Sequence, residues 1–524
     1  MTKFSKIVVI GAGTMGSGIA AHLANSNRQV VLLDLKGKDK PNQISENAID
    51  IIKKSDPPLL VERSRLEHIK PGNLEDDFDE IKDADWVIEA VVERIDIKHK
   101  LYSQIDKVRS PNSIISSNTS TIPLSILTQE MSDTMKADFC ITHFFNPVRF
   151  MRLLEIVETP TMNKDKMSGL RDFCQNELGK GIVNCNDTPG FIGNRIGVLG
   201  MSVTMNTAIK NGLTVEEVDK LTGTIIGRPK SATFRTADVV GLDTMINVSN
   251  TSYKNLPDDE EREEFKIPIF LQKLVDDGKL GAKTKAGFYK KTDEGILSVD
   301  LKTGEYGPQK KVRFDGFRLA KDRQTPNEKL KAMAYSDDKG GKFFWEILSR
   351  TLIYSANRLP EISDDIINID NAMKWGYGWE SGPFEVWDGI GVRESVERME
   401  KEGRKVPQWV NDMLASGRES FYEINDGNRT YFDVLSSTVK TEEQSEKSIN
   451  LNLHKTGGNL VKKDWSASLI DLGDGVLNVE FHSVLQPTLN PIDGSLGQTI
   501  SDGMDLLEAD KYQALVIGHQ GANF

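Results

Sequence analysis

The chain has 524 residues, of which 38% are hydrophobic and 27% charged, a composition that allows several buried cores and excludes the disordered class. Its length predicts about two to four domains. The 66 Lys and Arg against 78 Asp and Glu give a formal net charge of −12, which argues against non-specific binding to nucleic acid. No segment has the pattern of a secretory signal or the roughly 18 apolar residues of a transmembrane helix. We therefore expect a soluble, cytoplasmic protein of several domains.

The cysteines are too few for a structural framework. They are Cys140, Cys174 and Cys185, and their spacing fits neither paired disulfides nor a set of metal ligands. We therefore expect a reducing compartment and no metal site.

The first functional motif is a glycine turn between a strand and a helix. Residues 6–10 have the apolar, β-branched character of a buried parallel strand, and residues 17–24 that of a helix. The turn between them consists of Gly11, Ala12, Gly13, Thr14, Met15 and Gly16. In such a turn the first glycine permits the bend, the second lets a pyrophosphate approach, and the third lets the helix pack on the strand. The helix N-terminus then favours the negative charge of the phosphates.

A carboxylate at the end of the second strand favours a dinucleotide site over a purely structural turn. This strand covers residues 29–33 and ends at Asp34, 18 residues after Gly16. A carboxylate at this distance hydrogen-bonds the ribose hydroxyls of the adenosine. It would also repel a 2′-phosphate, so we predict NAD rather than NADP as the cofactor.

Strands and helices continue to alternate, which predicts an α/β, doubly wound parallel sheet of the Rossmann type. Further strands are expected at residues 85–91 and 113–117. Ligands of such a sheet lie beyond the carboxyl ends of the strands. Glu93, Asn118 and Ser120 follow directly after these ends, and we predict that they meet the cofactor or the substrate.

A histidine and a carboxylate are the candidates for the chemistry. His143 is one of seven histidines, and Glu155 follows twelve residues later within an apolar stretch. A carboxylate among apolar residues needs a partner, and it can hold the tautomer of a histidine and stabilise the imidazolium. A core histidine beside an unrelated glutamate would give the same spacing, so both interpretations stay open from the residues alone.

Six segments resemble the 3-hydroxyacyl-CoA dehydrogenase family, in its long form with a crotonase-like segment appended. They are, in chain order, GAGTMGSGIA, IEAVVERIDIKHKL, SSNTSTIPLS, HFFNPVRFMRLLEIVETP, DTPGFIGNR and KTKAGFYK. The resemblance implies that His143 is the general base and that Glu155 orients it. It also implies that Ser120 binds the substrate's hydroxyl or thioester region and that Asn194 completes the site. The positions that it associates with the nicotinamide cofactor are Glu93, Lys98, Asn146 and Lys283.

The implied reaction is the NAD-dependent oxidation of a (3S)-3-hydroxyacyl-CoA in fatty-acid β-oxidation. The histidine takes the hydroxyl proton and the nicotinamide takes the hydride. Structural roles remain open for two residues, since Ser120 could cap a helix that begins near residue 122 and Asn194 could simply start the next helix. Coenzyme A needs basic residues, and the resemblance favours Lys53 and Lys54. A solvated helix face is the alternative for this lysine pair.

Other functions share parts of this pattern. A 3-hydroxybutyryl-CoA dehydrogenase of a short-chain pathway would have the same motifs, because the sequence does not separate acyl chain lengths. A non-catalytic CoA- or NAD-binding module would keep the fold without needing the His143–Glu155 pair. A scaffold for a hydratase would need a complete hydratase site. We expect an enzyme that acts on acyl-CoA, with a thiolase or a hydratase as candidate partner.

The sequence divides into six predicted parts. They are an NAD-binding domain (1–187), a helical domain (188–291), a linker with some local order (292–341), a second helical copy with a hairpin (342–440), a charged linker (441–463) and a partial crotonase-like domain (464–524). The helical copies share Phe-x-x-x-Asp-x-x-Gly at 234–241 and again at 384–391. Ser349 stands where the first copy has Asn194, which predicts a catalytic first copy and a structural second one. In short family members this domain mediates dimerisation, so a homodimer and an internally paired monomer both stay open.

The last part resembles the opening of a crotonase domain. Its expected elements are strands at 468–472, 476–481 and 514–517 and a helix at 492–509. The sequence stops at Gly521-Ala522-Asn523-Phe524, before the glycine-rich turn that supplies part of the oxyanion hole in that family. We therefore expect a fragment of a longer hydratase/dehydrogenase, without hydratase activity. A hairpin is expected at 419–431, with its turn at Asn425-Asp426-Gly427.

Overall fold

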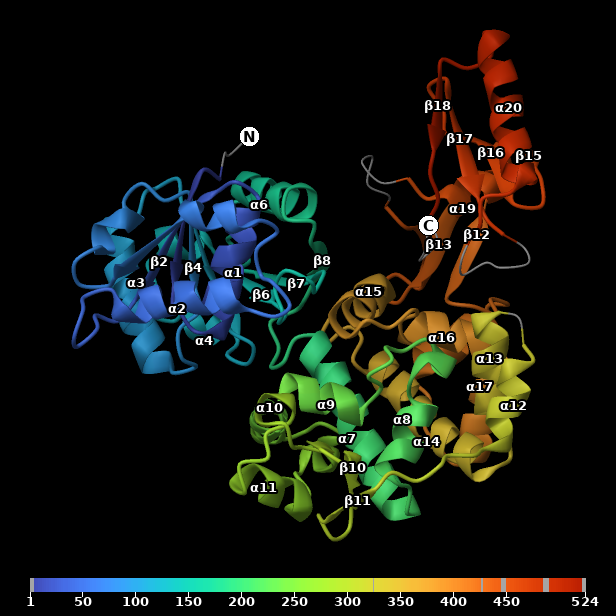
Figure 1. Ribbon diagram of the computed structural model, residues 1–524, viewed down its shortest axis with the longest axis horizontal. Helices are drawn as coiled ribbons and strands as arrows, with labels where there is room; N and C mark the ends of the chain where they lie inside the picture. The colour runs from blue at the N-terminus through green and yellow to red at the C-terminus, as the bar shows by residue number, and fades with distance from the viewer. Residues whose placement is uncertain (1–3, 324, 426, 444–448, 484–489, 521–524) are drawn as a thin grey trace. The chain divides into compact units, whose positions relative to one another are not determined.

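The computed structural model describes residues 4–323, 325–425, 427–443, 449–483 and 490–520 (Figure 1). The chain forms two compact units, residues 1–411 and 412–524, and each is described by itself. Within the described ranges, no helix is both long enough and apolar enough to cross a membrane.

The first unit opens with an eight-stranded sheet. Its strands are β1 (Lys6–Ile10), β2 (Gln29–Asp34), β3 (Ile69–Asn73), β4 (Trp86–Glu89), β5 (Ile114–Ser117), β6 (Phe139–Phe144), β7 (Leu153–Glu158) and β8 (Gly181–Asn184). They lie in the order β3-β2-β1-β4-β5-β6-β7-β8. The strands β1 to β6 are parallel, whereas β7 runs antiparallel to β6 and β8 is parallel to β7. The strand order reverses between β1 and β4, as in a Rossmann-type fold, so the predicted fold class is confirmed.

Helices pack against this sheet. They are α1 (Thr14–Asn25), α2 (Gln43–Lys54), α3 (Ile95–Val108), α4 (Leu124–Leu127), α5 (Asp133–Lys136) and α6 (Lys164–Asn176). Figure 1 shows α1 and α2 lying across the strands β2 and β4. The residues of β1 from Ile7 to Ile10 are fully buried, as expected for a parallel strand that is covered by helices.

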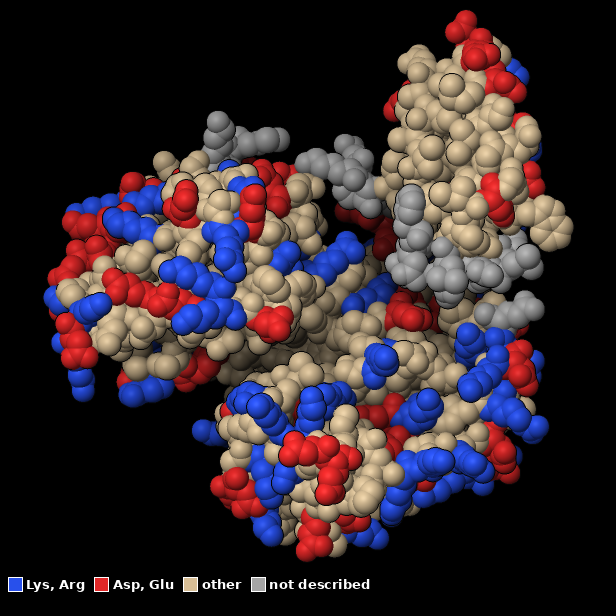
Figure 2. Space-filling view, in the orientation of Figure 1, with Lys and Arg blue, Asp and Glu red and all other residues tan. Residues whose placement is uncertain are grey.

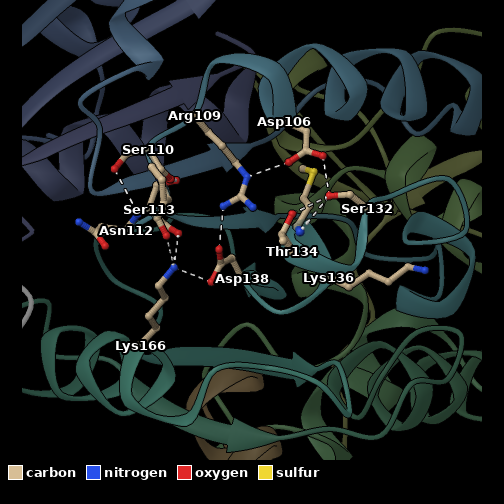
Figure 3. A network of polar contacts seen from close by, with 12 residues as sticks. Asp106, Arg109, Ser110, Asn112, Ser113, Ser132, Thr134, Lys136, Asp138 and Lys166 are labelled. Atoms are coloured by element: carbon tan, nitrogen blue, oxygen red, sulfur yellow. Dashed lines mark hydrogen bonds and ion pairs between the residues drawn. The ribbon is translucent and has the colours of Figure 1, made fainter.

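A polar network joins two of these helices to the amino ends of β5 and β6 (Figure 3). Asp138, directly before β6, pairs with Arg109 at 2.7 Å and with Lys166. Arg109 directly follows α3, and Lys166 lies in the first turn of α6 and donates to the carbonyl of Pro111 at 2.7 Å. The network lies at the ends of the strands opposite to the predicted ligand site, so we assign it to stability rather than to function.

The helical part begins with α7. Its first segment contains α7 (Gly193–Asn211), α8 (Val215–Leu221), α9 (Phe234–Val240), α10 (Leu242–Asn255) and α11 (Ile269–Asp276). The region expected as a linker, 292–341, holds regular elements. They are β10 (Gly295–Val299) and β11 (Tyr306–Pro308), which extend a sheet begun by β9 (Tyr289–Thr292), followed by α12 (Asp315–Lys321) and α13 (Pro326–Ala334).

A second helical segment follows, and its last helix extends past residue 411, where the first unit ends. It contains α14 (Lys339–Asn357), α15 (Ile366–Tyr377), α16 (Pro383–Ile390), α17 (Val392–Lys401) and α18 (Gln408–Ala415). The helix α14 packs along α7, and α15 packs against β7 and β8 at the edge of the large sheet. The second segment therefore contacts both the first helical segment and the Rossmann-type domain.

The two helical segments share local geometry. Asp219, in α8, accepts a hydrogen bond of 2.7 Å from a backbone N–H at the start of α9, and Asp370, in α15, accepts one of 2.8 Å at the start of α16. Gly241 and Gly391, which directly follow α9 and α16, have φ angles of 102° and 92°. Glycine is favoured at such angles because a Cβ would be strained there.

The described residues of the second unit form two small sheets. They are β12 (Tyr422–Asn425), β13 (Asn428–Asp433) and β14 (Thr438–Thr441), and β15 (Leu460–Lys463), β16 (Ala467–Asp471), β17 (Val476–Phe481) and β18 (Ala514–Ile517). The helices α19 (Leu451–His454) and α20 (Gly494–Glu508) accompany them, and α20 covers a small core that includes Leu469, Val479 and Leu496. The expected strands and helix are present, and β15 is an additional strand within the expected linker 441–463. Asp426 and residues 521–524 lie outside the described residues.

Candidate active site

The glycine turn leaves room for a phosphate group only at its middle glycine. Gly11 has a φ of 105°, and a Cβ there would lie 2.5 Å from the carbonyl oxygen of Ala90. A Cβ at Gly16 would lie 1.7 Å from the Gly11 carbonyl oxygen, so the helix packs on the turn only without a side chain. A Cβ at Gly13 would have no neighbour within 4 Å. This open space lies before Thr14 and Met15 at the start of α1, a helix without a side-chain cap, so the cradle fits a dinucleotide pyrophosphate.

Asp34 is held at the carboxyl end of β2, beside this turn. Its carboxylate accepts hydrogen bonds of 2.6 Å from the backbone N–H groups of Ala12 and Leu35. These contacts fix the carboxylate next to the glycine turn. The position fits the predicted contact with the adenosine ribose.

Lys98 is held in a buried cluster around Glu89, the last residue of β4. The Lys98 ammonium pairs with the Glu89 carboxylate at 2.7 Å, and both side chains are essentially inaccessible to solvent. Ser117 and Tyr102 also donate to Glu89, at 2.7 and 2.5 Å. Burial, together with the charge of Glu89, raises the pKa of Tyr102 well above its usual value. The lysine predicted to contact the cofactor thus anchors α3 to the end of β4.

Glu93 orders the loop that carries Ser120. Its carboxylate accepts hydrogen bonds from the Thr119 hydroxyl at 2.9 Å and from the Ser120 backbone N–H at 2.9 Å. Ser120 does not cap the next helix, because the backbone N–H groups of Leu124 and Ser125 at the start of α4 bind Asp187 instead. The alternative of a capping role for Ser120 is therefore wrong, and its hydroxyl makes only a long hydrogen bond of 3.5 Å to Glu93.

His143 and Glu155 form a direct pair across two strands. They are register partners in the antiparallel strands β6 and β7, and His143 Nδ1 donates to Glu155 Oε2 at 2.7 Å. Glu155 is completely buried and His143 is 6% exposed. Within the described residues Nε2 has no hydrogen-bond partner, and it is not a fully buried atom. The geometry fixes the tautomer and leaves Nε2 free to accept a proton.

Backbone groups from the start of α7 complete the surroundings of Glu155. Its second oxygen, Oε1, accepts hydrogen bonds from the N–H groups of Ile192 at 3.1 Å and Gly193 at 2.7 Å. The rings of Phe145 and Phe191 flank the imidazole, with centroids at 4.7 and 5.7 Å. Sequence reasoning missed these two N–H donors, although the GFIGNR segment that contains them was a recognisable signal.

Asn194 follows in the first turn of α7, and Arg195 ties this turn to the second helical segment. The buried Arg195 guanidinium pairs with Asp259 at 2.7 Å and donates to the Tyr354 hydroxyl of α14 at 2.7 Å. Tyr354 in turn donates to Asp259 at 2.7 Å. The turn that presents Asn194 and the N–H groups for Glu155 is thus anchored from outside the NAD-binding domain. Sequence analysis did not identify this anchor.

The structure brings Asn118 to the site but leaves other predicted residues apart. Asn118 follows β5, and its side-chain oxygen accepts a hydrogen bond of 2.9 Å from the backbone N–H that follows His143. Asn146 lies just beyond β6. Lys283 pairs with Asp243 in the helical region at 2.6 Å.

The lysines predicted for coenzyme A, Lys53 and Lys54, end α2, where Lys53 pairs with Asp50 at 3.1 Å. Within the described part of the chain, no cluster of side chains could hold a metal ion.

Two adjoining stretches match the domains of one family. Residues 6–188 match the NAD binding domain of 3-hydroxyacyl-CoA dehydrogenase, and residues 190–291 match its C-terminal domain. The chain belongs to the 3-hydroxyacyl-CoA dehydrogenase family. The match of the first domain, together with the open cradle at the glycine turn, confirms NAD as the cofactor.

Relatives extend this similarity over the rest of the chain. A Bacillus subtilis protein named "Probable 3-hydroxyacyl-CoA dehydrogenase" is 43% identical over 99% of this chain and 67% of its own length. A Rickettsia felis protein named "Putative fatty acid oxidation complex trifunctional enzyme" is 38% identical over 73% of this chain and 53% of its own. The chain thus spans about half to two thirds of these curated relatives.

A solved structure shares the fold beyond the NAD-binding domain. The 3-hydroxybutyryl-CoA dehydrogenase from Escherichia coli K12 matches 79% of this chain and 99% of its own, with a TM-score of 0.58 and 21% sequence identity. At this identity the similarity shows the fold alone.

Proposed function

We propose that the protein catalyses the NAD-dependent oxidation of (3S)-3-hydroxyacyl-CoA to 3-oxoacyl-CoA, with His143 as the general base. The observation that carries this proposal is the buried hydrogen bond between His143 and Glu155. It lies at the carboxyl edge of the same parallel strands whose first turn forms the NAD cradle. A binding module would need the cradle but no oriented base.

Each residue of the candidate site has a proposed role that follows from its position. His143 Nε2 accepts the proton of the 3-hydroxyl group, and Glu155 keeps the opposite ring nitrogen protonated and stabilises the imidazolium. When bound, NAD supplies the acceptor for the hydride. The Ser120 hydroxyl and the Asn194 amide hydrogen-bond the substrate oxygen and orient it. Lys53 and Lys54 offer positive charge to the phosphates of coenzyme A at the end of α2.

We propose fatty-acid β-oxidation as the setting of this reaction. The name of the Rickettsia relative supports it, since that protein is described as part of a fatty acid oxidation complex. The name also favours a thiolase or a hydratase as partner. The alternative, a short-chain enzyme, is supported by a Deinococcus radiodurans protein named "Probable 3-hydroxybutyryl-CoA dehydrogenase", 32% identical over 54% of this chain.

The second helical segment is proposed to be a duplicated copy of the first. The matched Asp219 and Asp370 contacts and the two glycines with positive φ support a common origin. Because α14 packs along α7 within one chain, internal pairing favours a monomer over a homodimer. The mass measured by light scattering tests this, and a dimer would contradict it.

The last segment is proposed to be crotonase-like in fold, and we expect no hydratase activity from this chain. Its order of two antiparallel strands, a helix and a strand parallel to the second supports the assignment. Hydration of crotonyl-CoA by the purified chain would contradict the expected lack of hydratase activity.

The oxidoreductase proposal is tested by NADH oxidation with acetoacetyl-CoA. We expect turnover with NADH, much less with NADPH, and a chain-length profile in a series of 3-oxoacyl-CoA substrates that separates the two settings. Binding of NADH and acetoacetyl-CoA without turnover would contradict the proposal and favour a binding module.

A further inference from the structure

A wide cleft in the helical region is lined by residues that play no part in the candidate active site. Its volume is about 1290 Å³. One wall comes from α8 and the residues up to the start of α9, and the other from residues 309–321, which lead into α12. The cleft exceeds the roughly 300–1,000 Å³ of a typical small-molecule pocket, so an extended ligand fits it.

Cations without carboxylate partners gather in this cleft. Within the described part of the chain, six lining cations form no ion pair with a carboxylate: Lys220, Lys230, Arg235, Arg313, Arg318 and Lys321. A seventh, Lys339, lies 3.9 Å from Glu217. Figure 2 shows Lys and Arg side chains along this edge of the helical region, near α8 and α14. The chain has a net charge of −12, so its overall composition does not account for a group of cations without carboxylate partners at one place.

Within the described residues, four of the five carboxylates that line the cleft already accept hydrogen bonds, and the exception is the exposed Asp315. Glu216 accepts hydrogen bonds from the Ser298 hydroxyl and the backbone N–H of Lys310. Asp219 binds backbone N–H groups at the start of α9 and the Tyr289 hydroxyl at 2.7 Å. Asp338 binds the backbone N–H groups of Gly316 and Gly341. Glu217 closes the capping box of α8. Because these groups already bind N–H donors, they compete weakly for the free cations.

Apolar and aromatic side chains share the lining with the cations. Ile225 lines the first wall, and Val312, Phe314 and Phe317 line the second. The rings of Phe314 and Phe317 lie with their centroids 5.6 Å apart. A ligand that suits this cleft therefore carries several negative charges and also an aromatic or aliphatic part.

We propose that this cleft binds a multiply charged organic phosphate with an apolar portion, the class that includes coenzyme A and its esters. Arg and Lys donate to phosphate oxygens, and the aromatic wall covers the base or the aliphatic arm. The cations line a hollow that carboxylates flank, which fits a soluble ligand better than a flat anionic surface. The site is separate from the NAD cradle and from His143, so its occupancy does not depend on the proposed reaction.

Calorimetric titration of coenzyme A into the full chain, saturated with NADH, tests the proposal. We compare the wild type with Arg313→Glu/Lys321→Glu, which reverses two charges of the cleft. The matched control is Lys254→Glu/Lys273→Glu, the same change at two exposed lysines that do not line the cleft. Since no replaced side chain holds an ion pair, we expect all variants to stay folded by circular dichroism.

We expect the cleft variant to bind one coenzyme A fewer per chain than the wild type, or to bind that molecule at least tenfold more weakly. The control should match the wild type, and turnover with acetoacetyl-CoA should stay within twofold in both. Identical titrations of wild type and cleft variant would overturn the proposal. The proposal would also be overturned, in favour of a lipid surface, by the following result. The cleft variant loses binding to phosphatidylglycerol vesicles but binds coenzyme A as the wild type does. If the proposed reaction is wrong, the wild type will show no turnover, but the wild type and the cleft variant will still differ in coenzyme A binding.

Discussion

His143 and Glu155 meet because β6 and β7 run antiparallel with these two residues in register. The chain between them is just long enough to turn and return along the neighbouring strand. Glu155 is then fully buried, and two backbone N–H groups satisfy the oxygen that the histidine does not use. A buried carboxylate with every oxygen hydrogen-bonded can hold the imidazole in one orientation without exposing charge to an apolar core.

We propose that Asp34 determines the choice between the two nicotinamide cofactors. We expect Asp34→Arg to lower the ratio of kcat/KM for NAD over NADP at least 100-fold, because the arginine removes a repulsive charge and can bind a 2′-phosphate. Initial rates with both cofactors measure this ratio. Asp39→Asn, at an exposed position in the following loop, is the matched control and should leave the ratio unchanged. An unchanged ratio in Asp34→Arg would contradict the assignment.

His22 makes stability depend on pH. Burial, with a smaller contribution from Lys180, lowers its pKa to about 3, and its Nε2 donates a hydrogen bond to the Leu178 carbonyl. Between pH 6.5 and 3 the unfolded chain binds a proton that the folded chain does not, so stability falls as the pH falls. We expect His22→Gln to reduce the loss of unfolding free energy between pH 7.5 and 5.0 by about 2 kcal/mol in urea titrations. The partly exposed His68→Gln should show the wild-type loss, and equal curves for all three proteins would contradict the assignment.

At the scale of elements, the sequence predicts those parts of the site that depend on residues close together in the chain. The first strand, the glycine turn and Asp34 follow one another in sequence, and the antiparallel pairing that joins His143 to Glu155 spans only twelve residues. The N–H groups of Ile192 and Gly193 were not predictable, because they reach Glu155 only after α7 docks. Lys98 shows the same limit, since its burial against Glu89 depends on how α3 packs.

The packing of α7 on α14 carries an expectation about stability. Tyr354→Phe removes the hydroxyl between Arg195 and Asp259 and leaves buried charged groups short of a hydrogen bond. We expect the free energy of unfolding to fall by about 1–3 kcal/mol in chemical denaturation. Tyr335→Phe is the matched control, because the buried Tyr335 hydroxyl has no hydrogen-bond partner among the described residues, and its removal should cost less than about 0.5 kcal/mol. Equal losses in the two variants would contradict the role of the Arg195 anchor.

At the scale of the whole molecule, the candidate site lies within the first unit and is contacted or anchored by residues of both helical segments. The first segment supplies α7, and the second anchors its first turn through Tyr354. The region 292–341 was expected as a linker because of its polar composition, yet it contains β10, β11, α12 and α13. Polar composition did not reveal these elements, because short strands and helices at a surface bury few residues.

Two truncations separate these contributions. A chain that ends after Gly417 keeps the first unit, and we expect its kcat with acetoacetyl-CoA to stay within twofold of the full chain. A chain that ends after Lys291 loses the second helical segment, and we expect at least a tenfold loss of kcat or failure to fold. Turnover assays with circular dichroism measure both. Full activity of the shorter chain would contradict the need for the second segment.

The most direct test of the central claim is the turnover of His143→Ala in NADH oxidation with acetoacetyl-CoA. We expect kcat to fall at least 100-fold while the affinity for NADH stays within threefold, because the base lies away from the phosphate cradle. His68→Ala is the control and should keep the wild-type kcat. If His143→Ala retains more than about a tenth of kcat, a loss of less than ~1.4 kcal/mol in transition-state stabilisation, His143 is not the general base.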